Sequence, residues 1–85
     1  MSVEVVLYGA PGCGLCDDAR RVLEAARAPL GFALREVDIS TDPRLEAAHR
    51  HEIPLVTIDG RRAFIFRVEP VELRRQVLAA SQSGR

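Results

Sequence analysis

The sequence predicts an α/β fold in which a mixed four-stranded sheet carries helices on both faces, with elements in the order β-α-β-α-β-β-α. Two observations lead to this prediction. Runs of β-branched and apolar residues alternate along the chain with amphipathic stretches of helical period. An Asp-Gly pair between the last two runs is typical of a tight hairpin. A length of 85 residues suits a single domain over residues 1–85.

The first strand and the first helix have clear patterns. Val3–Tyr8 is nearly continuously apolar and rich in valine, as a buried central strand is. Gly9–Gly12 interrupts it. Gly14–Ala28 then carries apolar residues at helical spacing with charged residues between them, so we expect the first helix there. We expect Pro29 and Gly31 to end this helix.

A second strand and a short helix follow. Phe32–Ile39 alternates between apolar and polar residues, which is typical of a strand. The next residues, Ser-Thr-Asp-Pro, predict a helix start with Thr41 or Asp42 as the N-cap and Pro43 in the first helical position. This helix should end near His51. Because a helix joins the first two strands, we expect them to be parallel with a right-handed crossover.

A hairpin and a last helix complete the chain. Leu55–Ile58 is predicted as the third strand, and Arg62–Phe66 returns antiparallel to it after the Asp-Gly turn. Pro70 opens the last helix. We expect apolar residues on one face of this helix: Leu73, Val77 and Leu78. Residues 81–85 form a polar tail that should fray.

The charge balance argues against some partners. Twelve basic and twelve acidic residues give a formal net charge of zero. Nucleic acids and anionic membranes call for a basic excess, so we expect neither as a partner. No signal peptide or membrane span is visible, and we expect a cytoplasmic, monomeric protein. In a reducing compartment, two cysteines spaced C-x-x-C are more often redox-active or metal-binding than joined in a purely structural disulfide.

Both cysteines lie in the stretch GAPGCGLCDDA, between the first strand and the first helix. With Cys13 at the N-cap or in the first turn, its sulfur faces unpaired N–H groups and the positive end of the helix dipole. Both favour the thiolate, so the pKa of Cys13 should fall below that of a free cysteine. Cys16 lies on the same face, deeper under the helix. We expect Cys13 to attack a target disulfide and Cys16 to resolve the mixed disulfide. Leu15 should form an exposed rim that touches the partner.

Other interpretations of the cysteine pair stay open. The two cysteines could be buried residues without a role, or incidental thiols of an interaction module. With His49 and His51 they would make a Cys₂His₂ set, although positions i and i+2 of a helix face apart. Paired thiolates could also hold a metal ion or an iron–sulfur cluster, across a dimer. We expect surface histidines and no resident metal.

The element order, the CGLC motif after the first strand and the Ile-Pro pair before the hairpin together resemble the thioredoxin-like fold. Within it, the chain is most similar to small glutaredoxin-like proteins over nearly all of Val3–Ala80. The resemblance implies that Pro54 follows a cis peptide bond and packs near Cys13. It also implies that the main chain at Ile53 offers hydrogen bonds to an extended peptide or thiol ligand. Tyr8 matches an aromatic residue common at the end of that first strand, where it would line the site.

The resemblance further implies a small thiol–disulfide oxidoreductase that requires no cofactor and has glutathione as a candidate co-substrate. Its target would be a disulfide-containing protein or a glutathione mixed disulfide. The expected catalytic residues are Cys13 and Cys16, and the expected substrate contacts are Tyr8, Pro11, Leu15, Ile53 and Pro54. The chain differs from ordinary glutaredoxins at Ala10, at Gly14-Leu15 and in AFIFRVEP, which has no glycine pair. A metal or iron–sulfur binding module of the same fold is the alternative.

Overall fold

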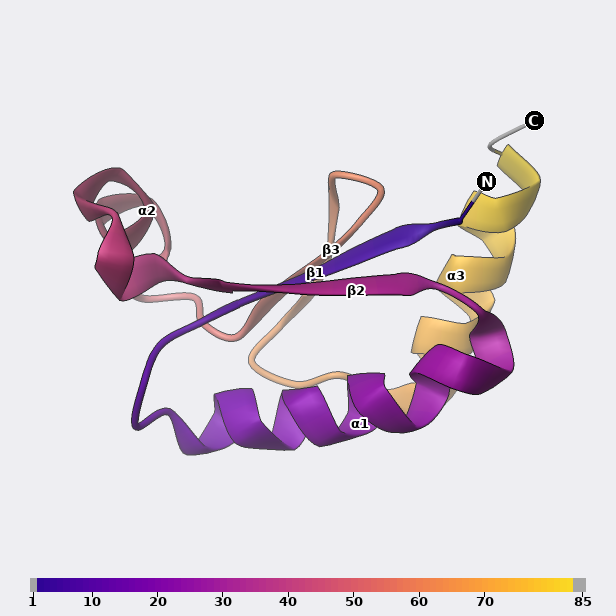
Figure 1. Cartoon of the computed structure of the whole chain (residues 1–85), viewed down its shortest axis with the longest axis horizontal. Coiled ribbons are helices and arrows are strands. Elements are labelled where there is room, and N and C mark those ends of the chain that lie inside the picture. Colours follow the sequence, from indigo (N-terminus) through magenta and orange to yellow (C-terminus); the bar gives the residue numbers. More distant parts are fainter. Residues whose placement is uncertain (1, 84–85) are drawn as a thin grey trace.

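The computed structural model describes residues 2–83 and confirms the predicted α/β fold (Figure 1). The elements are β1 (Glu4–Gly9), α1 (Gly14–Leu30), β2 (Ala33–Asp38), a 3₁₀ helix (Ile39–Thr41), α2 (Pro43–His49), β3 (Leu55–Ile58), β4 (Arg61–Ile65) and α3 (Pro70–Ser83). The sheet order is β2-β1-β3-β4. As expected, β1 and β2 are parallel, whereas β3 is antiparallel to both β1 and β4.

The hydrophobic core lies between one face of the sheet and the helices α1 and α3. Side chains alternate along a strand, so Val5 and Leu7 share one face of β1 while Val6 and Tyr8 share the other. Val5 and Leu7 belong to the core cluster together with Leu23 of α1 and Leu73 of α3. All three leucines are fully buried. Figure 1 shows α1 along one side of the sheet and α3 at the end of the sheet where α1 finishes.

The second face of the sheet is covered less completely. The helix α2 contains no buried residue and lies at one end of the sheet, beyond β2 (Figure 1). It reaches the face of Tyr8 through His49, whose ring centroid lies 5.3 Å from that of Tyr8. The helices therefore lie on both faces, as predicted, but α1 and α3 bury far more of the sheet than α2 does.

The hairpin between β3 and β4 forms as the Asp-Gly pair predicts. Asp59 and Gly60 both have positive φ, at 50° and 83°, which is the requirement of a type I′ turn. The turn is also tied to β1. The Asp59 N–H donates to the carbonyl oxygen of Glu4 at 2.8 Å, and the Asp59 carboxylate accepts from the Glu4 N–H at 2.9 Å. This links the turn to the first residue of the central strand.

Several helix boundaries differ from the prediction. Pro29 does not end α1, because a proline in the last turn gives up a single hydrogen bond. Gly31 ends the helix instead, at φ 74°, and its N–H donates to the carbonyl oxygen of Arg27 at 2.8 Å. Asp42 is the N-cap of α2, as one of the two predicted candidates, and α2 ends at His49 rather than near His51. The 3₁₀ helix before it was not expected.

The last helix also differs from its prediction. Leu73 and Val77 are buried as expected, but Leu78 is 43% exposed. Ala80 takes its place, since positions 73, 77 and 80 share one helical face whereas position 78 is rotated away from it. The tail was predicted to fray from residue 81, but α3 continues to Ser83. The rest of that predicted tail, residues 84–85, lies outside the described residues.

Candidate active site

Cys13 is the N-cap residue of α1, as the sequence predicted. Its backbone is extended, with φ −93° and ψ 106°, and its sulfur accepts a hydrogen bond from the Cys16 N–H at 3.1 Å. Its carbonyl oxygen accepts the Asp17 N–H at 3.2 Å. The sulfur therefore takes the position of a capping oxygen, directed at an N–H group that the helix itself cannot satisfy.

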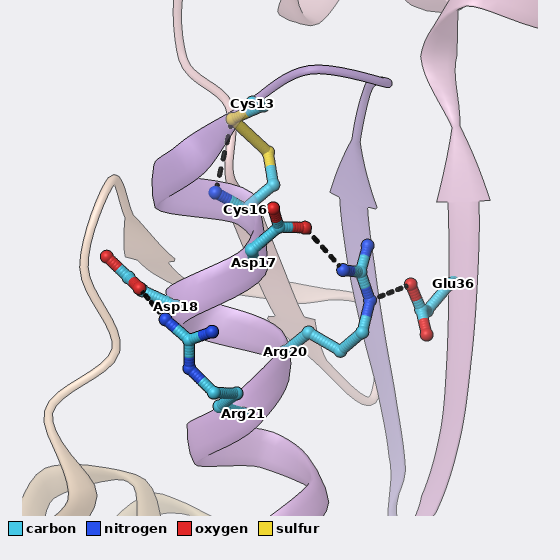
Figure 2. A network of polar contacts seen from close by, with 7 residues as sticks. All are labelled: Cys13, Cys16, Asp17, Asp18, Arg20, Arg21 and Glu36. Atoms are coloured by element: carbon cyan, nitrogen blue, oxygen red, sulfur yellow. Dashed lines mark hydrogen bonds and ion pairs between the residues drawn. A yellow bond between two sulfur atoms is a disulfide. The ribbon is translucent and has the colours of Figure 1, made fainter.

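The two cysteines are joined in a disulfide bond at the start of α1 (Figure 2). Their Cα atoms are 5.2 Å apart. The two sulfurs differ in access, because Cys13 is partly exposed whereas Cys16 is 1% exposed. An incoming reagent can thus approach Cys13 but not Cys16.

Gly9 lets Cys16 pack against the end of β1. A Cβ atom at this position would lie 3.0 Å from the Cys16 sulfur and 3.3 Å from the Cys16 Cβ. Only a residue without a side chain avoids this contact. The sequence predicts only a strand break at Gly9, because the role of this residue against the buried cysteine depends on a contact between two elements.

A charged network fixes the first turns of α1 to β2. The Arg20 guanidinium donates to Asp17 and to Glu36, at 2.7 Å in each case, and so bridges the helix and the strand (Figure 2). The hydrogen bond to Glu36 raises the pKa of Arg20, and the hydrogen bond to Asp17 adds a smaller effect in the same direction, so the guanidinium stays charged. On the other side of the helix, Arg21 pairs with Asp18. The helix that carries the cysteines is therefore held against its neighbouring strand.

Pro54 lies at the same end of the sheet as the cysteine motif. Tyr8 pairs with Leu55, so the start of β3 lies beside the end of β1, where the chain leaves toward Cys13. The Ile53–Pro54 peptide bond is cis, and Pro54 is fully buried. Its carbonyl oxygen accepts the Phe66 N–H at 2.8 Å. Ile53 is partly buried beside it.

Tyr8 lies on the face of the sheet opposite to α1. Its ring packs on His49 with an interplanar angle of 44°. His49 was expected at the surface, but its ring is held by neighbouring side chains. Its nitrogen Nδ1 lies 2.9 Å from a carboxylate oxygen of Glu52, and Arg62 of β4 donates a hydrogen bond to the same oxygen. These contacts join α2, the segment before Pro54 and the hairpin. His51 is exposed, as predicted.

Glutamine in place of Glu52 should lower the melting temperature near neutral pH, with a difference that shrinks in acid. The hydrogen bond from His49 lowers the pKa of Glu52 in the folded chain, and the hydrogen bond from Arg62 adds a smaller effect in the same direction. The carboxylate thus adds stability above its unfolded pKa of ~4.3, and this is lost as the pH falls through the lower folded value. Thermal melting across this range measures it, with Glu46→Gln, an exposed site on α2, as control. A difference independent of pH would contradict the prediction.

The predicted substrate contacts do not gather in one place. Leu15, which is 42% exposed, lines a hollow of about 300 Å³ between α1 and the segment after β4, together with Phe66 and Pro70. Pro11 lines a different hollow of about 290 Å³, beside Arg20 and β2. Tyr8 lines neither. Phe66 was not predicted from the sequence, because it carries no motif and is defined by its position across from Leu15.

The described residues contain neither a cluster of metal-ligating side chains nor a helix that could span a membrane. Within residues 2–83, no group of three or more His, Cys, Asp or Glu side chains is placed to hold a metal ion. No helix in the same range has the length and apolar character needed to cross a membrane.

The chain is similar to a known protein family and to solved structures. The family described as Glutaredoxin-like domain (DUF836) matches residues 4–78. The target protein XcR50 from X. campestris is 31% identical, with a TM-score of 0.73 over 88% of this chain and 96% of that one. No curated protein matches the chain.

Other solved structures are similar in fold. Protein Ne2328 from Nitrosomonas europaea is 18% identical, with a TM-score of 0.73 over 95% of this chain and 92% of that one. A thioredoxin mutant from Halobacterium salinarum is also 18% identical, with a TM-score of 0.71 over 92% of this chain and 74% of its own. The chain has a thioredoxin-like fold and, with a family match over most of its length, belongs to the glutaredoxin-like domain family.

Proposed function

We propose that this protein is a thiol–disulfide oxidoreductase that reduces a disulfide in its target. The observation that supports this most is the pairing of a partly exposed N-cap cysteine with a buried partner, joined in a disulfide. The helix N-terminus favours the Cys13 thiolate, which is the form that attacks a disulfide. The family match is consistent with this chemistry.

The reaction has two exchange steps. The Cys13 thiolate attacks one sulfur of the target disulfide, so that a Cys13–target bond forms, the target S–S bond breaks and one target thiolate leaves and takes up a proton. Cys16 then loses its proton and attacks the Cys13 sulfur. The mixed disulfide breaks, the second target thiolate leaves, and the Cys13–Cys16 disulfide forms. Two electrons pass from the cysteines to the target.

Pro54 and Ile53 have a supporting role in this proposal. Pro54 would form the wall opposite Cys13, and the main chain at Ile53 would hydrogen-bond an extended target as an added strand does. We propose that the protein acts as a monomer in the cytoplasm, requires no resident cofactor and uses protein disulfides or glutathione mixed disulfides as targets.

A Cys16→Ser variant should accumulate a mixed disulfide. The first exchange can proceed at Cys13, but serine cannot resolve the intermediate because its hydroxyl is not ionised near neutral pH. Mixing the reduced variant with a peptide disulfide should give a stable covalent adduct, seen by mass spectrometry and released by a reductant. The unchanged protein should give free peptide thiols instead. Absence of both adduct and thiol release would refute the proposal, and visible absorbance with bound iron would favour the metal-binding alternative.

A further inference from the structure

Gly9 ends the central strand on the face of the sheet that carries the core. It continues the row of Val5 and Leu7 along β1, is buried, and lies opposite Asp38 of β2 in the sheet register. Its backbone does not require a glycine. The turn that follows does require one at Gly12, where φ is 77°, whereas Gly9 has no positive φ. The advantage of a glycine at position 9 is therefore space and not backbone freedom.

Cys16 occupies the space that Gly9 leaves free. Within residues 2–83, the atoms that a Cβ at position 9 would meet inside 4 Å, apart from its chain neighbours, are the sulfur and the Cβ of Cys16, at 3.0 and 3.3 Å. Contacts this short force the neighbouring atom to move by a few tenths of an ångström. The Cys13 sulfur is not among these atoms. A side chain at position 9 would therefore act on the buried cysteine and not directly on the exposed one.

The strand and the helix on either side of this contact are both held in place. The strand β1 lies between β2 and β3 in the sheet. On the helix, Ala19 and Leu23 follow Cys16 on the same face of α1 and are buried, at 2% and 0% exposure. The bridge from Arg20 to Glu36 holds the same turns of α1 against β2. Because the core is closely packed, an added methyl group at position 9 displaces the Cys16 side chain before it separates α1 from β1.

We propose that Gly9 is a positioning residue for the resolving step, in which it lets the Cys16 sulfur reach Cys13 and so sets how fast a bound target is released. This rests on the proposed function for the order of the two exchanges. In the resolving step the Cys16 thiolate bonds to the Cys13 sulfur, the bond from Cys13 to the target breaks, and the target thiolate leaves and takes up a proton. The two cysteines are oxidised and the target is reduced. The first exchange does not use Cys16, so its rate should not depend on position 9.

Alanine in place of Gly9 should slow the resolving step about tenfold, as overpacking of a filled site does. The reduced protein is mixed with a peptide disulfide and quenched with acid, and mass spectrometry follows the mixed disulfide and the free peptide thiol over time. In Gly9→Ala the mixed disulfide should accumulate before the second thiol appears. Gly14→Ala is the matched control, since a Cβ there meets nothing within 4 Å and its φ is not positive. An unchanged resolving step in Gly9→Ala, or equal slowing in both variants, would overturn the proposal.

The Cys16→Ser background separates positioning of the sulfur from general damage to the fold. In this background the first exchange proceeds alone, and adding Gly9→Ala should leave the rate of adduct formation at Cys13 unchanged. Slower adduct formation in the double variant would mean that the methyl group disturbs the whole start of α1, and would overturn the proposal. If Gly9→Ala alone does not fold, the double variant still should, because a serine oxygen is smaller than a sulfur. Failure of both to fold would assign Gly9 to strand packing and overturn the proposal as well.

The equilibrium between the protein disulfide and dithiothreitol tests Gly9 without any target. The methyl group of Gly9→Ala meets the Cys16 sulfur at the place that it occupies in the disulfide. This variant should therefore be half-reduced at an about tenfold lower ratio of reduced to oxidised dithiothreitol, whereas Gly14→Ala should titrate with the unchanged protein. If the unchanged protein reduces no peptide disulfide while this shift is present, the proposed function fails and the positioning of Cys16 by Gly9 stands. Coincident titrations of Gly9→Ala and the unchanged protein would overturn the positioning role.

Discussion

Serine in place of Cys13 is expected to abolish disulfide exchange and leave the fold of the reduced protein intact. A serine hydroxyl is not ionised near neutral pH, so no nucleophile remains at the exposed position, and Cys16 is buried. Single-turnover exchange should fall by at least about 10³-fold. The fold should persist because serine is among the best N-cap residues and can accept the Cys16 N–H as the Cys13 sulfur does.

A Cys13→Ala variant is the matched comparison. It removes the nucleophile and also the cap, so the reduced variant should lose about 1 kcal/mol of unfolding free energy relative to Cys13→Ser. Chemical denaturation under reducing conditions measures this difference, and the exchange assay measures activity. Residual exchange by Cys13→Ser near the rate of the unchanged protein would show that Cys13 is not the nucleophile.

Alanine in place of Leu73 is expected to cost about 2–5 kcal/mol of unfolding free energy. The Leu73 side chain is fully buried and belongs to the core cluster that joins α3 to the sheet and α1. Truncation removes its apolar contacts and leaves a cavity. In a domain of this size, each 1 kcal/mol shifts the melting temperature by about 4–8 °C, so the transition should move far enough to be unmistakable.

Leu78→Ala on the same helix is the control for this prediction. Leu78 is 43% exposed, so its truncation should change the unfolding free energy by no more than about 0.5 kcal/mol. Guanidinium unfolding of the three oxidised proteins, with the disulfide intact, gives both differences. Similar losses at the two positions would mean that Leu73 does not hold the core as its burial indicates.

Much of the fold follows from local patterns. The Asp-Gly pair determined the hairpin because its backbone preference is a property of two adjacent residues. Asp42 before Pro43 determined the start of α2 for the same reason. The errors arose where a local signal competes with packing. Leu78 has the apolarity of a core residue, but the rotation of α3 on the sheet buries Ala80 instead.

The positions of the two cysteines at the start of α1 follow from local sequence alone. The spacing of Cys13 and Cys16 after a strand places one sulfur at the N-cap and the other within the first turn, since both positions depend only on helical geometry. The surroundings of the two cysteines, in contrast, depend on tertiary packing. Gly9 lies under Cys16, Phe66 stands across from Leu15, and Tyr8 turns to His49 on the other face. These contacts join residues far apart in the chain, and the sheet register and the packing of α1 determine which residues meet.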